Sequence, residues 1–123
     1  MHKIDLLITL THDENNGNNV TLAFAMGTKA AMAGHKVELL LLSNAVHLGQ
    51  VGYGDKIDIG QPFEPVKDLI PAFLNAGGKL KICSACMIHN GVKEEDLMEG
   101  TEVINADYVV DALMAAEKSF QLN

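Results

Sequence analysis

The chain alternates between short runs of apolar residues and longer segments in which apolar residues recur at helical spacing. A short apolar run bounded by turn residues is typical of a strand, whereas helical spacing is typical of a helix with one buried face. The short runs predict strands over residues 4–11, 36–42, 79–83, 101–104 and 119–122. The second run is apolar almost throughout, which is typical of a strand covered on both faces of a parallel sheet.

Helical spacing and capping residues place the predicted helices between these strands. An asparagine in the polar segment 12–19 can cap a first helix that ends at Gly34. A second helix is predicted to begin at Pro65 and to be kinked or split at Pro71, because proline lacks the amide hydrogen that an inner helical turn requires. Asn105 is predicted to cap the last helix. Shorter helical segments are predicted over residues 43–49, 84–90 and 93–98.

Strands that alternate with helices indicate a single domain over residues 1–123, an α/β fold built as a three-layer α/β/α sandwich. Its sheet is predicted to be parallel and mostly five-stranded, and we expect a flavodoxin-like strand order. In such a sheet the loops that follow the strands gather along one edge, where ligands bind. Five polar or reactive side chains are predicted to share that edge: His12, Asp13, Ser43, His47 and Cys83.

Composition narrows the range of functions. The formal net charge is −7, and the nine basic side chains are all lysines. Nucleic-acid binding normally uses a basic face and arginine side chains, so we expect no nucleic-acid partner. The N-terminal apolar run is too short and too interrupted for a signal peptide or a membrane span. We therefore expect a cytoplasmic protein, not bound to a membrane, whose cysteines stay reduced.

Both cysteines of the chain lie in one segment, residues 79–91, which is predicted to be a buried strand that runs into a short helix. Cys83 ends the strand, so its thiol would lie at the first turn of the helix. Unpaired amide groups and a partial positive charge at that position favour the thiolate, which is the nucleophilic form of cysteine. We therefore predict a reactive, catalytic role for Cys83, against the alternative of a small buried hydrophobic residue.

Cys86 follows one helical turn later, so the two sulfurs could face the same side of the helix. It could be a resolving thiol, or a core residue on the inner face of the helix. Four further side chains are candidates for supporting roles: His12, Ser43, His47 and Ser84. The two histidines are candidate proton acceptors for a thiol, because histidine titrates near cellular pH.

Two other cysteine chemistries are disfavoured. A thioredoxin-like site needs a cis-proline from a later loop, and no proline follows Pro71. Structural zinc needs four ligands, usually from two separated pairs, whereas Cys83, Cys86 and His89 form a single string. The glycine-rich residues 49–56 do not match a phosphate-binding motif, and we predict a flap over the cysteine site instead. We expect neither a metal nor a cofactor.

Several segments, in their order along the chain, resemble the DsrE/DsrF-like family of small sulfur-relay proteins, which includes the TusD-type sulfurtransferase subunits. The segments are Ala33–Val37, Ala76–Cys83, Asn90–Val92 and Glu99–Ile104. The resemblance implies a five-stranded parallel sheet, assembly into trimers or hexamers, and a cysteine that accepts sulfane sulfur as a persulfide. That cysteine, at the end of the third strand, matches Cys83, whereas the position of Cys86 varies within the family.

Three hypotheses about function follow. In the first, the protein is a sulfur carrier or sulfurtransferase that receives sulfur on Cys83 from a donor protein and passes it to an acceptor protein. In the second, it is a binding or assembly module of the same fold, in which Cys83 only packs. In the third, Cys83 and Cys86 form a dithiol redox switch. The sequence leaves open whether the protein is an enzyme.

Overall fold

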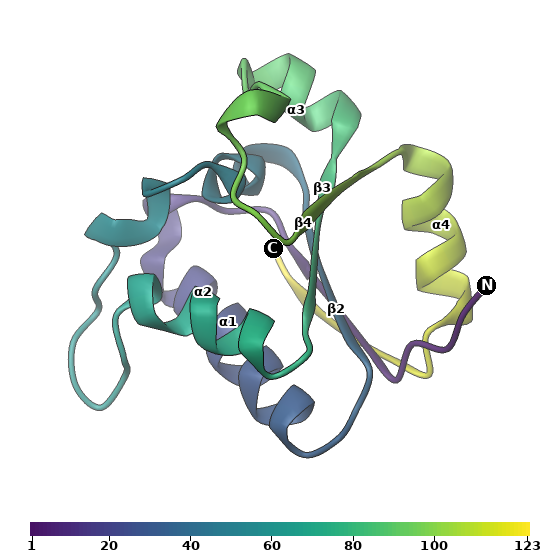
Figure 1. Cartoon of the computed structure of the whole chain (residues 1–123), viewed down its shortest axis with the longest axis horizontal. Coiled ribbons are helices and arrows are strands. Elements are labelled where there is room, and N and C mark those ends of the chain that lie inside the picture. The colour runs from purple at the N-terminus through teal and green to yellow at the C-terminus, as the bar shows by residue number, and fades with distance from the viewer.

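The structure, a computed structural model, describes all 123 residues. A five-stranded sheet forms its centre, and every strand pairing in the sheet is parallel. The strands are β1 (Leu6–Leu10), β2 (Val37–Leu41), β3 (Lys79–Cys83), β4 (Thr101–Ile104) and β5 (Lys118–Leu122). Helices cover both faces of the sheet (Figure 1). The predicted α/β sandwich with a parallel five-stranded sheet is therefore confirmed.

The strand order differs from the flavodoxin-like order that we predicted, and that part of the prediction is wrong. The order across the sheet is β4-β3-β2-β1-β5. In the flavodoxin order β2 and β3 lie on opposite sides of β1, whereas here β2, β3 and β4 follow one another on one side and β5 lies on the other. Hydrophobic spacing identifies strands but does not indicate to which side of the first strand the chain turns.

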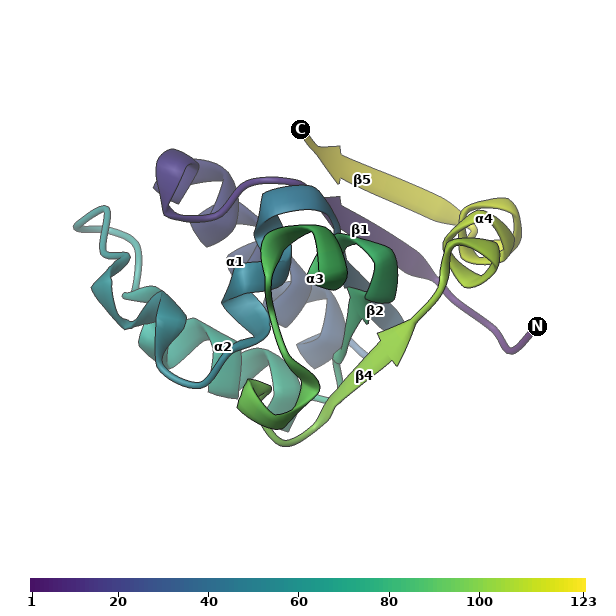
Figure 2. The same cartoon turned by 90° about the horizontal axis from the view of Figure 1, so that it is seen from above.

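The direction of each crossover determines which face its helix covers, because crossovers between parallel strands are right-handed. The helices α1 (Gly17–Met32) and α2 (Val66–Asn75) belong to the crossovers from β1 to β2 and from β2 to β3. Both crossovers step the same way across the sheet, so both helices lie on one face. The helix α4 (Ala106–Ala115) returns from β4 to β5 and lies on the other face (Figure 2). The short helix α3 (Ser84–Asn90) lies at the edge of the sheet where β3 ends.

Short 3₁₀ segments fill most of the loops between these elements. They are η1 (Glu14–Asn16), η2 (Ser43–Gly49), η3 (Tyr53–Lys56) and η4 (Glu94–Asp96). The side chain of Asn105 accepts a hydrogen bond from the backbone amide of Tyr108, so the predicted cap of α4 is confirmed. The helix α2 is not split at Pro71. Pro71 is exposed, so water can reach the carbonyl of Lys67 that proline leaves without an amide partner.

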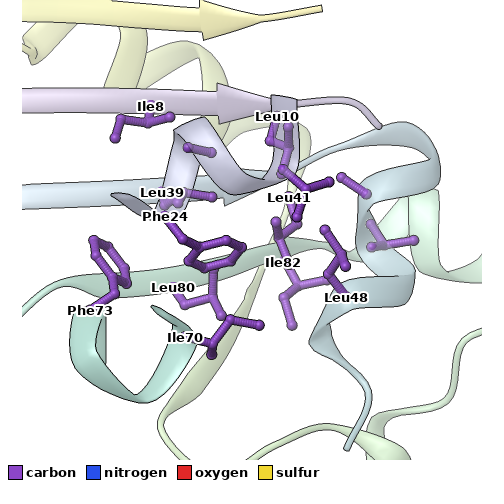
Figure 3. Close-up of a cluster of buried hydrophobic side chains, with 14 of the residues drawn as sticks. Ile8, Leu10, Phe24, Leu39, Leu41, Leu48, Ile70, Phe73, Leu80 and Ile82 are labelled. Carbon is purple, nitrogen blue, oxygen red and sulfur yellow. The ribbon is translucent and has the colours of Figure 1, made fainter. Parts of the chain in front are cut away.

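The main core fills the space between the sheet and the helices α1 and α2. Aliphatic side chains of β1, β2 and β3 meet Phe24 of α1 and Phe73 of α2 there (Figure 3). The two rings pack edge to face with their centroids 6.0 Å apart, a favourable aromatic geometry. A smaller cluster lies under α4 and comprises Ile4, Leu7, Leu40 and Ala112. The strand β2 is buried along its whole length, as its apolar sequence predicts.

A buried charged network, which the sequence pattern did not reveal, joins α4 to the sheet. The ammonium group of Lys81 lies 3.3 Å from a carboxylate oxygen of Glu38. The Tyr108 hydroxyl accepts a hydrogen bond from Lys81 and donates one to Glu38, each at 2.6 Å, and His2 contacts the second Glu38 oxygen. Burial disfavours the Glu38 charge, but the hydrogen bonds from His2 and Tyr108 and the charge of Lys81 outweigh burial and lower the pKa of Glu38.

Candidate functional site

Both cysteines lie at the β3–α3 junction, at the edge where all the strands have their carboxyl ends. Cys83 is the last residue of β3 and the residue that precedes the first turn of α3, and its side chain makes no capping hydrogen bond. Its neighbour across the sheet is Ile104, the last residue of β4. Neither cysteine is in a disulfide. Ser84 is half-buried and donates no side-chain hydrogen bond, so the structure gives it no specific contact with either thiol.

Cys83 is more enclosed than a freely reactive thiol would be. Only 6% of its surface is exposed, and it belongs to the main core together with Met87 and Ile104. Cys86 is half-buried and is the more accessible of the two thiols. The burial of Cys83 is what the packing hypothesis expects, and a donor can reach its sulfur only if α3 or a neighbouring segment moves.

The environment of Cys86 keeps its thiol protonated. Burial raises the pKa of Cys86, a hydrogen bond from the backbone amide of Ser43 opposes this effect, and the neighbouring Cys83 thiol raises the pKa further. Ser43 has a left-handed backbone conformation (φ 54°), which is uncommon for a residue other than glycine, asparagine or aspartate. Of the predicted supporting residues, Ser43 is thus the one that the structure brings to a cysteine, through its backbone and not its hydroxyl.

Asn90 fastens the end of α3 and was not among the predicted site residues. Its side-chain amide donates a hydrogen bond of 2.8 Å to the carbonyl of Cys86 and one of 3.4 Å to the carbonyl of Ser43. The helix ends directly afterwards at Gly91, which has a left-handed conformation (φ 71°). The spacing of four residues between Cys86 and Asn90 was the available sequence signal, since such residues are neighbours on a helix.

Neither His12 nor His47 forms a hydrogen bond with a thiol. His47 lies with one ring nitrogen 3.3 Å from a carboxylate oxygen of Asp13 and 3.0 Å from the carbonyl of Asn44. Its ring stacks on Tyr53, with 5.3 Å between the ring centroids. His12 is half-buried and makes no side-chain hydrogen bond. The polar contacts at this edge therefore pair His47 with Asp13 and not with a cysteine.

Further polar contacts extend from His47 through Tyr53 to the exposed side chains of Glu14 and Lys56. The pKa of Tyr53 is raised, first by burial and then by its hydrogen bond to Glu14. The same hydrogen bond is the main cause that lowers the pKa of Glu14. The ammonium group of Lys56 lies 4.5 Å from the centre of the Tyr53 ring and 3.7 Å from Glu14. These contacts hold the Tyr53 and His47 rings in place, and none of them involves a cysteine.

The glycine-rich residues 49–56 are packed against the core and do not form the predicted flap. Residues 50 and 97 pair as an antiparallel bridge, and the carbonyl of Gly49 accepts a hydrogen bond from the amide of Met98. A Cβ atom at Gly49 would lie only 2.4 Å from the end of the Ile82 side chain. Glycine at this position therefore permits close packing and is not needed for a hinge.

Two cavities of the protein lie away from the cysteines. One of about 600 Å³ lies at the opposite edge of the sheet and is lined mainly by polar side chains, among them Lys36, Lys79 and Glu38. Another of about 310 Å³ lies beside α2 and is lined by Leu48, Ile70 and other residues. Neither is lined by a cysteine. No three His, Cys, Asp or Glu side chains are grouped to hold a metal ion, and no helix is long and apolar enough to cross a membrane.

Solved structures with the same fold cover almost the whole chain. The ychN protein of E. coli superposes with a TM-score of 0.72 at 18% identity, over 97% of this chain and 99% of that chain. A conserved protein of unknown function from Bacteroides thetaiotaomicron gives 0.70 at 19% identity, over 96% and 94% of the two chains. A protein of unknown function from Methanobacterium thermoautotrophicum gives 0.65 at 16% identity, over 95% and 99%.

Sequence comparison identifies the family. No curated protein matches the chain. The sequence profile of the DsrE/DsrF-like family matches residues 5–122, which contain all five strands. The strand–helix order, the placement of the cysteine at the end of β3 and this match agree with the resemblance noted in the sequence. The chain therefore belongs to the DsrE/DsrF-like family.

Proposed function

We propose that this protein is a sulfur carrier that accepts sulfane sulfur as a persulfide on Cys83 and passes it to a partner protein. Family membership supports a role in sulfur relay, and the position of Cys83 supports its assignment as the carrier residue. The observation that carries the proposal is the placement of the cysteine pair at the β3–α3 junction, where the carboxyl ends of the parallel strands meet.

The reaction is an exchange between a thiolate and a persulfide. The Cys83 thiolate attacks the outer sulfur of a donor persulfide, R–S–SH, and displaces R–S⁻. The products are Cys83–S–SH and the donor thiolate, so one sulfur atom moves and no external oxidant or reductant is consumed. An acceptor thiolate then removes the outer sulfur by the same exchange and restores the Cys83 thiolate. The residue therefore ends each cycle in the state in which it began.

Access to Cys83 requires local opening, and α3 is the element most suited to it. The helix has seven residues, fewer than an isolated helix needs for stability in water, and Met87 is its only fully buried residue. Segments with few buried contacts open at lower free energy than the sheet does. Burial between these openings would protect a persulfide from solvent and small oxidants until a partner docks beside α3.

The test compares the two cysteines, since each is a matched control for the other. Wild type, Cys83→Ser and Cys86→Ser are incubated with a small-molecule persulfide such as glutathione persulfide, desalted at once, and measured by intact mass spectrometry. We expect wild type and Cys86→Ser to gain one sulfur atom and Cys83→Ser to gain none. If Cys83→Ser gains sulfur as fast as Cys86→Ser, Cys83 is not the carrier and the proposal is wrong.

The competing hypothesis of a non-catalytic module has one observation in its favour, the 6% exposure of Cys83. In that case Cys83 only fills space, and none of the three proteins takes up sulfur at a rate above that of an unfolded cysteine peptide. The same experiment separates the two functions, because a carrier loads at one named residue.

We further propose that the protein acts as a homo-oligomer, a trimer or hexamer, in the cytoplasm, where its thiols stay reduced. Val110 and Met114 lie one turn apart on α4 and are 57% and 83% exposed, although both are apolar. Ile88 on α3 is 82% exposed. A second copy that covered these side chains would remove apolar surface from water. Light scattering coupled to size-exclusion chromatography tests this, and a monomer at micromolar concentration would contradict it.

A further inference from the structure

A second free thiol, that of Cys86, lies one helical turn from the proposed carrier residue. Cys83 and Cys86 are three positions apart across the first turn of α3, a spacing at which side chains are neighbours, with about 5–6 Å between Cβ atoms. A disulfide requires Cβ atoms about 3.5–4.5 Å apart, so the pair can form one if the first turn of the short helix α3 closes by roughly 1–2 Å. The Cys83 thiol is also one of the groups that raise the pKa of Cys86.

We propose that Cys86 is a resolving thiol that attacks a Cys83 persulfide, forms a Cys83–Cys86 disulfide and releases the carried sulfur as sulfide. This inference rests on the proposed function, because it needs sulfur on Cys83 first. It adds a second outcome for the loaded protein: sulfur that no acceptor removes leaves as sulfide, and the carrier is switched off as a disulfide.

The geometry favours attack at the inner sulfur of the persulfide. Displacement at sulfur needs the incoming and leaving atoms on opposite sides of the sulfur that is attacked. Transfer to Cys86 would require its sulfur to lie beyond the outer atom, in line with the S–S bond and more than one S–S bond length farther from Cys83. Instead, Cys86 lies in the first turn of α3, next to Cys83 at the start of the helix, so its side chain begins beside the Cys83 side chain and not beyond it. The inner sulfur is therefore the atom within reach, and the outer sulfur is the leaving group.

The step balances without any added redox partner. Cys83–S–S⁻ and Cys86–SH give the Cys83–S–S–Cys86 disulfide and HS⁻, and the proton of Cys86 ends on the released sulfide. The two cysteine sulfurs are oxidised to a disulfide, and the sulfane sulfur is reduced by two electrons to sulfide. A dithiol reductant such as dithiothreitol then returns the protein to its starting state.

Several contacts control how fast Cys86 acts. The Cys83 thiol, at the end of β3, favours the protonated form of Cys86, whereas the backbone amide of Ser43, in η2, favours its thiolate. On the same helix, the side-chain amide of Asn90 donates a hydrogen bond to the backbone carbonyl of Cys86. The raised pKa of Cys86 leaves less of its thiolate, so its attack is slower than that of an unperturbed thiol.

The experiment follows the fate of a loaded sulfur in the full-length protein. Wild type, Cys86→Ser, Cys86→Ala and Cys83→Ser are loaded with one equivalent of glutathione persulfide and desalted, and their intact mass and the released sulfide are measured over time. We expect the wild-type mass to fall from one added sulfur to two hydrogens below the reduced protein, with one sulfide released per chain. Both Cys86 variants should keep the added sulfur at least about tenfold longer.

The outcomes separate the two proposals. If wild type keeps its sulfur as long as the Cys86 variants do, the resolving role is wrong and the carrier role stands. If neither Cys86 variant gains sulfur at all, the carrier role is wrong and this inference fails with it. If Cys83→Ser releases sulfide as wild type does, the sulfide comes from the donor and the resolving role is again wrong. A thermal unfolding curve for each variant checks that it is folded.

Discussion

Gly78 lies directly before β3, the strand that carries Cys83, and we predict that alanine cannot replace it. A Cβ atom at Gly78 would lie 2.3, 2.4 and 2.6 Å from three atoms of the Phe73 ring. Carbon atoms in contact are normally about 3.5–4.0 Å apart, so the new methyl group would overlap the ring by more than 1 Å. The overlap involves a flat, rigid ring and not the end of a flexible chain.

The Phe73 ring cannot move away from the new methyl group. It is fully buried, it packs against Phe24, and α1 approaches it so closely that a Cβ atom at Gly27 would lie 2.9 Å from it. Overpacking of a core costs about 1–3 kcal/mol, and we take the upper end because the ring is wedged between two backbones. Alanine also lowers the conformational entropy of the unfolded chain, which offsets about 0.5–1 kcal/mol of this loss of stability. Gly78→Ala should therefore lower the free energy of unfolding by about 2 kcal/mol and the melting temperature by roughly 8 °C.

The neighbouring glycine supplies the control. Gly77 has a φ of 100° and nothing within 4 Å of its Cβ position, so Gly77→Ala is strained but meets no atom. Both substitutions should destabilise, for different reasons. Phe73→Leu removes ring atoms and should rescue Gly78→Ala, with a coupling energy of at least about 1 kcal/mol in a double-mutant cycle. It should not rescue Gly77→Ala. Urea denaturation of the two cycles measures this, and additive effects of Gly78→Ala and Phe73→Leu would refute the packing argument.

Four further predictions follow from the buried pair and the thiol site. Lys81→Met leaves the Glu38 carboxylate buried without its cation and should lower the free energy of unfolding by about 3 kcal/mol, whereas Lys81→Met with Glu38→Leu should recover most of the loss in urea denaturation. Because the folded pKa of Glu38 is lowered, its contribution is present above the usual value of 4.5 and is lost as the pH falls through the folded value. Glu38→Gln should therefore flatten the acid side of the stability curve, and an unchanged slope would contradict this. Asn90→Ala should free the end of α3, so that iodoacetamide alkylates Cys86 several-fold faster; an unchanged rate would mean that the amide does not hold the helix. In Cys83→Ser the alkylation of Cys86 should shift to lower pH, since one cause of its raised pKa is gone, and a profile that stays in place would contradict the thiol contact.

Local signals in the sequence were sufficient to predict the elements. The bounds of β3 and β4 match the predicted ranges, and Asn105 caps α4 as its position before an apolar-spaced segment predicted. These features depend on spacing and on side chains that bond to their own backbone within a few residues. The helix α2 was the exception, because whether Pro71 splits a helix depends on whether the unpaired carbonyl faces water, and burial is set by the tertiary structure.

The contacts of the site could not be predicted, because they depend on the strand order. In a flavodoxin-like order β1 would separate β2 from β3, and the loop with His12 would lie beside Cys83. In the observed order β2 and β3 are neighbours. This adjacency brings Ser43 to Cys86 at one end of the strands and Glu38 to Lys81 toward the other. One incorrect assumption about topology thus accounts both for the expected nearness of His12 to Cys83 and for the buried pair that was missed.

The burial of Cys83 is compatible with a carrier role because of how α3 is held. A rigid cover would make the thiol inert, but α3 is short, buries little and is fastened at its far end mainly by Asn90. Its opening therefore costs less than unfolding of the sheet. In the proposed mechanism, closing of the helix places Cys86 beside Cys83 again, so the same movement that admits a donor also starts the step that discards unclaimed sulfur. The proposed lifetime of the persulfide then depends on how the protein holds α3, and not only on the supply of an acceptor.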